Sequence, residues 1–298
     1  MSVYGSSTVR IGGSVEGTRL LWQSATVTSV VEGMEGPALE NDRTPHPFED
    51  QLNSARVYDY LLGGKDNRAI DRGMAHQMLS RAPELKTLAW FTRSFLRTAV
   101  EMAAEAGIRQ FIDLGSGIPN SPNVHEVARE IEPTARVVYV DYDPVVVAHC
   151  DALLAKSPGV AALLGDVRRP HDILDQLNDR ALIDLDEPVA VMFISVLHYV
   201  MDDEHPAEIT AAFRDRLAPG SYVAIAHGSS DSDPEILQVL TGTNNTSAQV
   251  AFRSTAQTET FLAGFEVFEP GVVPVQQWLR PGLPDTRMVM LGAIGRKP

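Results

Sequence analysis

The sequence predicts an α/β protein, with a doubly wound, mostly parallel sheet of seven strands and an N-terminal helical lid. Five short apolar runs between residues 109 and 228 alternate with helical segments, which is typical of strands covered by helices on both faces. Two further strand-like segments follow within residues 264–278 and 287–298, without a clear helix between them. We expect these two segments to pair antiparallel at one edge of the sheet.

The region before the sheet divides into two parts. Residues 1–45 are rich in Gly, Ser and Thr, so we expect a loosely ordered extension with at most a strand or short helix. The prolines of "RTPHPFED" then mark a boundary, because they prevent a helix from running through. Residues 46–106 form the expected lid, and residues 107–298 the core. The lid helices are expected in "SARVYDYLLGG", "NRAIDRGMAHQMLSRAP" and "LKTLAWFTRSFLRTAVEMAAEAG", the last with Trp90, Phe91 and Phe95 packed inward.

The charge and composition of the chain exclude several classes of partner and site. The 298 residues carry a formal charge of −14, which repels phosphate backbones and anionic surfaces, so we expect neither nucleic acid nor membrane as a partner. The single cysteine, Cys150, excludes an intramolecular disulfide and is expected to be a small buried side chain. The histidines lack metal-ligand spacing, so no metal is expected. Without a long apolar run or a signal peptide, the expected location is cytoplasmic.

The residues that end the predicted strands are the candidates for a binding site, because ligands of open α/β sheets bind beyond the carboxyl ends of the strands. Gly115 and Gly117 let the backbone approach a ligand closely. Asp141, 24 residues after Gly117, is placed to accept hydrogen bonds from both ribose hydroxyls. Asp166 is placed to accept an adenine amino group, with Tyr142 packing on the adenine face. The predicted adenosine site consists of Asp113, Gly115, Ser116, Gly117, Asp141, Tyr142, Asp166, Val167 and Ser195.

The loop after the first strand distinguishes between two adenosine ligands. A dinucleotide site has a third glycine and runs directly into a helix that faces the pyrophosphate. Here Asn120 takes the glycine position, and the helix is expected only from Asn123, in a capping box with Glu126. His125 is expected on the surface of that helix. Because Asp113 also favours a cationic ligand, we predict S-adenosylmethionine, which carries a sulfonium and an ammonium group.

The motifs also resemble those of a known family. Asp-Leu-Gly-Ser-Gly, Val-Asp-Tyr-Asp-Pro and Gly-Asp-Val are similar to the first three signature motifs of class I S-adenosylmethionine-dependent methyltransferases, which have a Rossmann-like fold. More specifically, "SARVYDYLLGGKDNRAIDR", "GIRQFIDLGSGIPNSPNVHEVA", "ARVVYVDYDPVVVAHC", "VLHYV" and "GRKP" resemble an actinobacterial methyltransferase family formerly described as a domain of unknown function. The resemblance covers residues 45–298. It implies the cofactor and the class I fold, and makes Pro119 a family trait, but implies no acceptor.

Two regions are candidates for completing the pocket. The segment "VYDYLLGGKDNRAIDR" is expected to lie over the cofactor, with Tyr58 and Asp66 as catalytic candidates and Gly64 and Lys65 as cofactor contacts. The alternative is a helix stop followed by a solvated charged turn. His198, just beyond the fourth strand, is a candidate for a general base or for orienting an acceptor. The alternative for His198 is a structural histidine.

We expect methyl transfer to a small-molecule acceptor. This reaction is an in-line displacement that depends largely on how the acceptor is positioned. It needs a base only if the attacking atom of the acceptor still carries a proton. A non-catalytic S-adenosylmethionine-binding protein or sensor is the alternative, since nothing identifies an indispensable base. A nucleotide-dependent oxidoreductase is disfavoured by Asn120 and by the lack of a Tyr-x-x-x-Lys pair.

Overall fold

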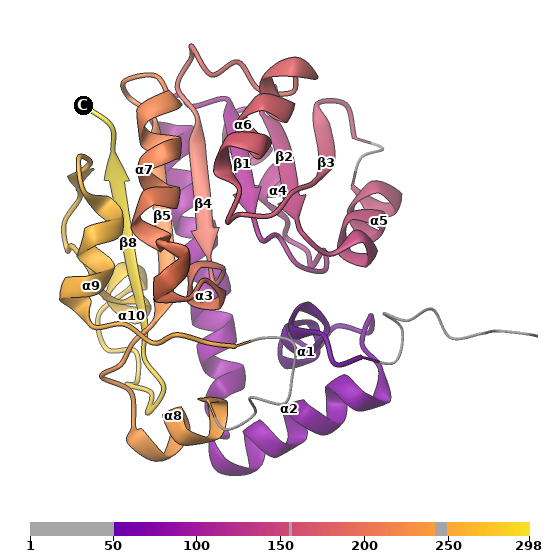
Figure 1. Ribbon diagram of the computed structural model, residues 1–298, viewed down its shortest axis with the longest axis vertical. Helices are drawn as coiled ribbons and strands as arrows, with labels where there is room; N and C mark the ends of the chain where they lie inside the picture. Colours follow the sequence, from indigo (N-terminus) through magenta and orange to yellow (C-terminus); the bar gives the residue numbers. More distant parts are fainter. Residues whose placement is uncertain (1–50, 155–156, 242–248) are drawn as a thin grey trace, which may run out of the picture. The chain divides into compact units, whose positions relative to one another are not determined.

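The central sheet has the strand order β3-β2-β1-β4-β5-β8-β6, with the short β7 pairing beside β8 (Figure 1). The computed structural model describes residues 51–154, 157–241 and 249–298, and the extension expected at residues 1–45 lies outside these ranges. The strands are β1 (Gln110–Leu114), β2 (Arg136–Asp141), β3 (Val160–Leu164), β4 (Ala190–Ile194), β5 (Tyr222–Gly228), β6 (Glu266–Val267), β7 (Val273–Pro274) and β8 (Met290–Arg296). The predicted doubly wound, mostly parallel sheet is confirmed.

The strand order reverses at β1, and this position determines where a ligand can bind. Ile112 of β1 pairs with Val138 of β2 on one side and with Val191 of β4 on the other, in parallel register. The connections after β1 and β4 therefore leave in opposite directions, which opens a crevice at the carboxyl ends of the strands. β8 runs antiparallel to β5, with Ala226 opposite Gly292. The predicted antiparallel closure of the sheet is thus confirmed, although β8 lies inside the sheet, between β5 and β6.

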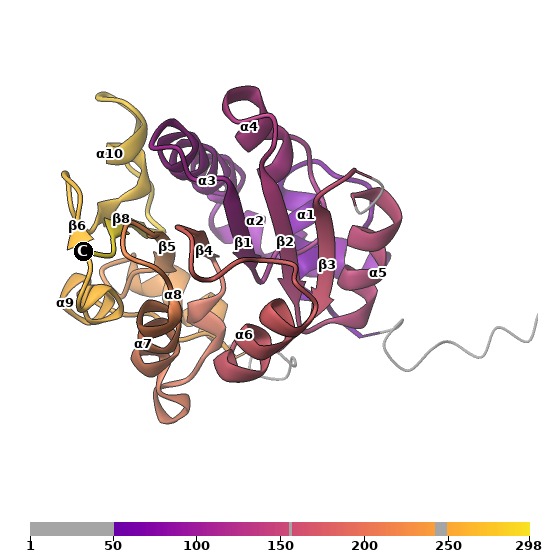
Figure 2. The same cartoon turned by 90° about the horizontal axis from the view of Figure 1, so that it is seen from above.

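Helices cover both faces of the sheet (Figure 2). The first face carries α3 (Leu85–Glu105), α4 (Val124–Ile131), α5 (Pro144–Leu153) and α10 (Val275–Leu279). The second face carries α6 (Pro170–Asp179), α7 (Pro206–Arg216), and α9 (Thr255–Glu259) with the 3-10 turn η3 (Thr260–Leu262). The remaining elements are α1 (Ser54–Leu61), α2 (Ala69–Arg81), α8 (Pro234–Thr241), η1 (Leu197–Tyr199) and η2 (Asp202–Glu204). No helix in these described ranges is long and apolar enough to cross a membrane.

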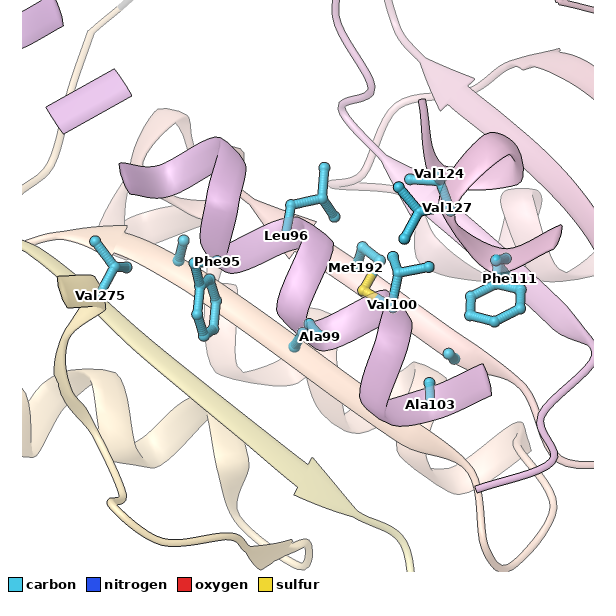
Figure 3. Close-up of a cluster of buried hydrophobic side chains, with 14 of the residues drawn as sticks. Phe95, Leu96, Ala99, Val100, Ala103, Phe111, Val124, Val127, Met192 and Val275 are labelled. Atoms are coloured by element: carbon cyan, nitrogen blue, oxygen red, sulfur yellow. The ribbon is translucent and has the colours of Figure 1, made fainter. Parts of the chain in front are cut away.

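The longest helix, α3, forms the centre of the first core. Phe95, Val100 and Ala103 are completely buried, because they recur on the face of α3 that lies against the sheet. Phe111 on β1 and Met192 on β4 belong to the same buried cluster, in which Val100 lies next to Met192 and Phe95 lies toward Val275 of α10 (Figure 3). Burying large side chains such as these typically contributes about 1.5–3 kcal/mol each to the free energy of unfolding.

Two details of the sequence prediction were wrong. Trp90 was expected to pack inward, but its side chain is 67% exposed, while Phe91 and Phe95 are buried as expected. Trp90 occupies the face of α3 that carries Arg93 and Arg97, one and two turns further on, rather than the face toward the sheet. Residues 264–278 were expected to be strand-like with no helix before the next strand, but their end forms the five-residue α10. An element this short has too few residues for a helical period to be visible.

Candidate functional site

The glycine loop follows β1 at the crevice. Gly115 and Gly117 have φ angles of +65° and +64°, a left-handed conformation that side chains with a Cβ rarely adopt. A Cβ atom on Gly115 would also lie 2.6 Å from Cγ2 of Val196, which follows β4. The loop therefore requires glycine for its backbone and for its close packing against the neighbouring connection.

Asp141 fastens this loop to the end of β2. Its side chain is 6% exposed, and its Oδ2 accepts a hydrogen bond from the Gly117 backbone nitrogen at 3.0 Å. Its Oδ1 accepts one from the Asp143 backbone nitrogen, also at 3.0 Å. Burial raises the pKa of Asp141 above its usual range, and these backbone hydrogen bonds counteract the increase. Each oxygen retains a second lone pair for a ligand hydroxyl. The neighbouring Tyr142 is 60% exposed, so a face of its ring is accessible to a ligand.

Asp166 is paired in a way that the sequence analysis did not foresee. Arg168 donates from Nε to Oδ1 at 2.9 Å and from Nη2 to Oδ2 at 2.6 Å. Burial by itself would raise the pKa of Asp166, but the hydrogen bonds from Arg168 outweigh it, and the pKa lies below its usual range. Asp166 is therefore ionised, and the half-buried Val167 lies beside it. Its expected role as acceptor of an adenine amino group remains a prediction.

Asp113 is the next-to-last residue of β1 and carries a buried carboxyl group. It is 5% exposed, and no residue of the described ranges donates a hydrogen bond to its side chain. Burial raises the pKa of Asp113 to about 7, while the positive charge of Arg93 on α3 acts in the opposite direction. Arg93 was not among the residues predicted from the sequence. A narrow cavity under the glycine loop is lined by Arg93, Asp113, Ser116, Gly117, Ile118, Pro119, Asn120, Asn123, Tyr139, Cys150 and Leu154.

The helix after this loop begins as predicted. Glu126 accepts a hydrogen bond from the Asn123 backbone nitrogen at 2.5 Å, which forms the predicted capping box of α4. The prediction that His125 lies on the surface was wrong. It is buried, and its Nδ1 is hydrogen-bonded to the Tyr139 hydroxyl at 2.9 Å. The first turn of α4 faces β2, so this position points inward. Cys150 is buried, as expected.

Helix α1 lies at the carboxyl ends of the parallel strands (Figure 1). The side chain of Ala55 would be 3.8 Å from a Cβ built on Gly117, so α1 lies directly against the glycine loop. The side-chain amide of Asn53 donates to the carboxylate of Asp143, and Tyr58 donates from its hydroxyl to the Ala89 carbonyl at 3.2 Å. Burial raises the pKa of Tyr58 to about 12, so this hydroxyl keeps its proton.

The turn after α1 requires glycine at position 64, because the side chain of Asp59 fills the space beside it. A Cβ on Gly64 would lie 1.9 Å from Oδ1 of the buried Asp59. Asn67 closes this turn, donating from its side-chain amide to Asp59 at 2.8 Å and to the Gly64 carbonyl at 2.9 Å. Lys65 and Asp66 are exposed, and no hydrogen bond joins them to the glycine loop within the part of the chain that the structure describes. The roles expected for Gly64, Lys65 and Asp66 remain predictions.

The connection after β4 carries Ser195, a predicted cofactor contact, and His198, the candidate for orienting an acceptor. Ser195 has a φ angle of +59°, and such strained non-glycine residues are concentrated at functional sites. His198 on η1 is 9% exposed, and its Nδ1 has no hydrogen-bond partner among the described residues. Burial, together with smaller effects of His227 and Arg253, lowers the pKa of His198 to about 3, so its imidazole is neutral.

A buried arginine beneath η1 was also missed by the sequence analysis. Arg253 is 3% exposed and donates from Nη1 to the Leu197 carbonyl at 3.2 Å and from Nη2 to the Val200 carbonyl at 2.7 Å. Its Nη1 lies 2.9 Å from Nε2 of His227, and its Nη2 lies 2.7 Å from Oδ1 of Asp202. Arg253 therefore fixes η1 against the end of β5. Nothing in its local sequence signals this role, because all of its partners are distant along the chain.

Comparisons with known proteins agree with this geometry. The family model described as S-adenosyl methyltransferase matches residues 48–298. A DUF574 family protein from Streptomyces avermitilis is 37% identical, with 83% of this chain and 98% of that chain covered and a TM-score of 0.79. A candidate methyltransferase from Thermobifida fusca is 40% identical, with 85% and 98% covered and a TM-score of 0.78. No curated protein matches. The chain belongs to the S-adenosyl methyltransferase family, whose members depend on S-adenosylmethionine.

Proposed function

We propose that this protein transfers the methyl group of S-adenosylmethionine to a small-molecule acceptor. The observation that supports a small acceptor is the position of α1. Ala55 packs against Gly117 of the glycine loop, and Asn53 is hydrogen-bonded to Asp143 at the end of β2. A helix in this position restricts access for a folded macromolecule. The formal charge of −14 also disfavours nucleic acid as the acceptor.

The residues at the strand ends fit the predicted cofactor. Asp141 has the remaining lone pairs that ribose hydroxyls require, and the exposed ring of Tyr142 suits stacking on adenine. The Asp113 carboxylate is buried and receives no hydrogen bond from the described residues, an expensive state that a bound ammonium group would relieve. We propose that Ser116, Val167 and Ser195 complete the binding surface around these side chains.

The cofactor would supply an electrophilic methyl group on its sulfonium, and the task of this chain is to bind and orient the acceptor. We propose His198 for that task, and because its unpartnered Nδ1 is buried, an acceptor O–H or N–H would reach this atom only with a shift of η1. A pKa of about 3 makes His198 a weak proton acceptor. We therefore propose that His198 orients the acceptor and does not remove a proton from it. Tyr58, with a pKa of about 12, keeps its proton and donates it to the Ala89 carbonyl, so toward a bound acceptor its hydroxyl oxygen would accept a hydrogen bond.

The test is to incubate the purified protein with S-adenosylmethionine carrying a labelled methyl group and with a cell extract separated by molecular size. We expect the label to enter compounds in the small-molecule fraction. An Asp141→Ala variant should transfer none, because it loses the anchor of the glycine loop. Label in protein or nucleic acid would contradict the small acceptor. Cofactor binding without transfer to any fraction would favour the alternative of a non-catalytic sensor.

A further inference from the structure

The guanidinium group of Arg253 uses all five of its N–H donors, and most of them bind the chain that follows β4. Nε and Nη2 both donate to Oδ1 of Asp202, at 3.1 Å and 2.7 Å. Nη2 also donates to the Val200 carbonyl at 2.7 Å, and Nη1 donates to the Leu197 carbonyl at 3.2 Å and to Nε2 of His227 at 2.9 Å. An ammonium group has three donors where a guanidinium group has five, so a lysine cannot make all of these contacts.

His227, which holds the guanidinium group at the end of β5, has a defined protonation state. It is completely buried, and this burial lowers the pKa of His227 to about 4, so the imidazole is neutral. Its Nδ1 lies 2.8 Å from the Gly228 carbonyl, which can only accept, so the ring proton is on Nδ1. Nε2 therefore presents its lone pair to Arg253. The guanidinium group thus has a fixed position relative to the sheet.

The backbone beside Arg253 holds the same part of the chain. The Ala251 nitrogen donates to the His198 carbonyl at 2.8 Å. The Arg253 nitrogen donates to the Gly228 carbonyl at 3.1 Å, and the Arg253 carbonyl accepts from the Ser230 nitrogen at 3.0 Å. This short segment therefore ties η1 to the end of β5 through its backbone as well as through its side chain.

η1 begins beside the glycine loop, because Val196, the residue before it, packs against Gly115. We propose that Arg253 is a positioning residue for methyl transfer, which sets the position of η1 and thereby of His198. The acceptor reaches Nδ1 of His198 only with a shift of η1, so the hydrogen bonds of Arg253 determine how far η1 moves. Without them η1 would take up many positions, and a misplacement of about 1 Å lowers a reaction rate by as much as about 100-fold. The inference rests on the role proposed above for His198.

A double-mutant cycle separates this role from a contribution to stability alone. The assay is transfer of the labelled methyl group of S-adenosylmethionine to the small-molecule fraction of a cell extract, with each rate divided by the folded fraction from circular dichroism. For Arg253→Gln we expect at least about tenfold slower transfer, while the Kd of S-adenosylmethionine in calorimetry changes by less than about twofold. In a His198→Ala background, the same substitution should slow transfer by less than about twofold, because no imidazole remains to be positioned.

Arg129→Gln is the matched control. Like Arg253, Arg129 donates to two backbone carbonyls, but those of Ala135 and Pro158 lie before β2 and β3, at the amino ends of the strands. We expect Arg129→Gln to lower the melting temperature and to leave the rate per folded molecule unchanged. Arg253→Lys keeps the charge with fewer donors and should restore part of the rate.

If Arg253→Gln does not fold, Asp202→Ala takes its place in the cycle, since the Asp202 side chain is 79% exposed and accepts two of the five hydrogen bonds. Equal slowing with and without His198, or no slowing at all, would overturn the positioning role. Full transfer by His198→Ala alone would overturn the role of His198 and this inference with it. Absence of transfer by the unaltered protein would overturn the proposed function itself.

Discussion

The side-chain amide of Asn53 donates a hydrogen bond to the carboxylate of Asp143, and so joins the residues that cap the first turns of α1 and α5. Asn53 Oδ1 accepts from the Arg56 backbone nitrogen at 3.0 Å, and Asp143 Oδ1 accepts from the Val145 backbone nitrogen at 2.8 Å. Each side chain therefore caps its own helix while contacting the other. This link connects α1, which lies against the glycine loop, to the turn that follows Asp141.

Replacing Asn53 by Asp should weaken this link while keeping the cap. Asp retains the oxygen that accepts from Arg56 but loses the N–H donor, and it places a second carboxylate beside Asp143. Hydrogen bonds to charged groups contribute about 1.5–3 kcal/mol, so we expect roughly 10- to 100-fold faster local opening of residues 54–61. Hydrogen-exchange mass spectrometry measures this. Asn178→Asp, on the exposed end of α6, is the control. Unchanged exchange in α1 would contradict the importance of the link.

The two glycines after α1 should respond differently to substitution. Gly63 has a φ angle of +84° and open space around a Cβ, so Gly63→Ala should cost only the strain of about 1–2 kcal/mol. Gly64→Ala places a methyl group on the Asp59 carboxylate, so the turn must rearrange and the stability should fall further. Urea unfolding of both variants provides the comparison. A larger loss for Gly63→Ala would show that the contact with Asp59 does not explain Gly64.

Binding of S-adenosylmethionine should depend on the ionisation of Asp113. Its pKa of about 7 means that the carboxyl group becomes charged, and able to pair with an ammonium, as the pH rises through 7. We expect the affinity to increase between pH 6 and pH 8 in calorimetry, and Asp113→Asn to remove most of this increase. If the variant retains the full pH dependence, another group is responsible.

The raised pKa of Asp113 also affects the stability of the ligand-free protein. Because the folded pKa of Asp113 lies above the unfolded value of about 3.8, its contribution to stability is complete below pH 4 and is lost as the pH rises through 7. Asp113→Asn should therefore make the ligand-free protein more stable at pH 8, with a smaller difference at pH 5. Thermal unfolding at the two pH values tests this. A variant that is less stable at pH 8 would show that the carboxylate has a partner that stabilises its charge.

The buried histidines should make the protein sensitive to acid. Burial lowers the pKa of His198 to about 3 and that of His227 to about 4, while both histidines titrate near 6.5 when unfolded. Their contribution to stability is therefore present above pH 6.5 and is lost as the pH falls toward 4. His227→Gln should lower the stability at pH 7 but reduce the loss between pH 6.5 and 4.5. His171→Gln, at an exposed position, should leave the slope unchanged.

The features that were predictable from the sequence depend on residues close together in the chain. β1 is buried at every position, which matches its continuous apolar run, and Gly115 and Gly117 have the φ angles that only glycine adopts readily. Asp141 lies at the end of the next strand, so its spacing from Gly117 was enough to bring the two together. In such cases the local pattern and the parallel sheet together determine the position of a residue.

The missed features depend on contacts between distant segments. Arg93 lies in a helix that looks amphipathic, and only the packing of α3 beside the loop brings it to Asn120, 27 residues later. Arg253 donates hydrogen bonds to backbone carbonyls that lie more than 50 residues earlier in the chain. His125 is buried because Tyr139 provides a hydrogen-bond partner at the inner face of α4. Helical periodicity predicts which side of a helix is polar. It does not predict whether a distant segment of the chain will pack on that polar side and bury it.

The position of β8 inside the sheet has a consequence for synthesis of the protein. β5 ends at residue 228, but the strand that pairs with all seven of its residues ends only at residue 296. Until the ribosome has released that strand, the apolar edge of β5 has no antiparallel neighbour and can pair with another chain. At about 5–20 residues per second, this interval lasts several seconds. A nascent chain stalled within it should therefore depend on chaperones far more than the completed protein does.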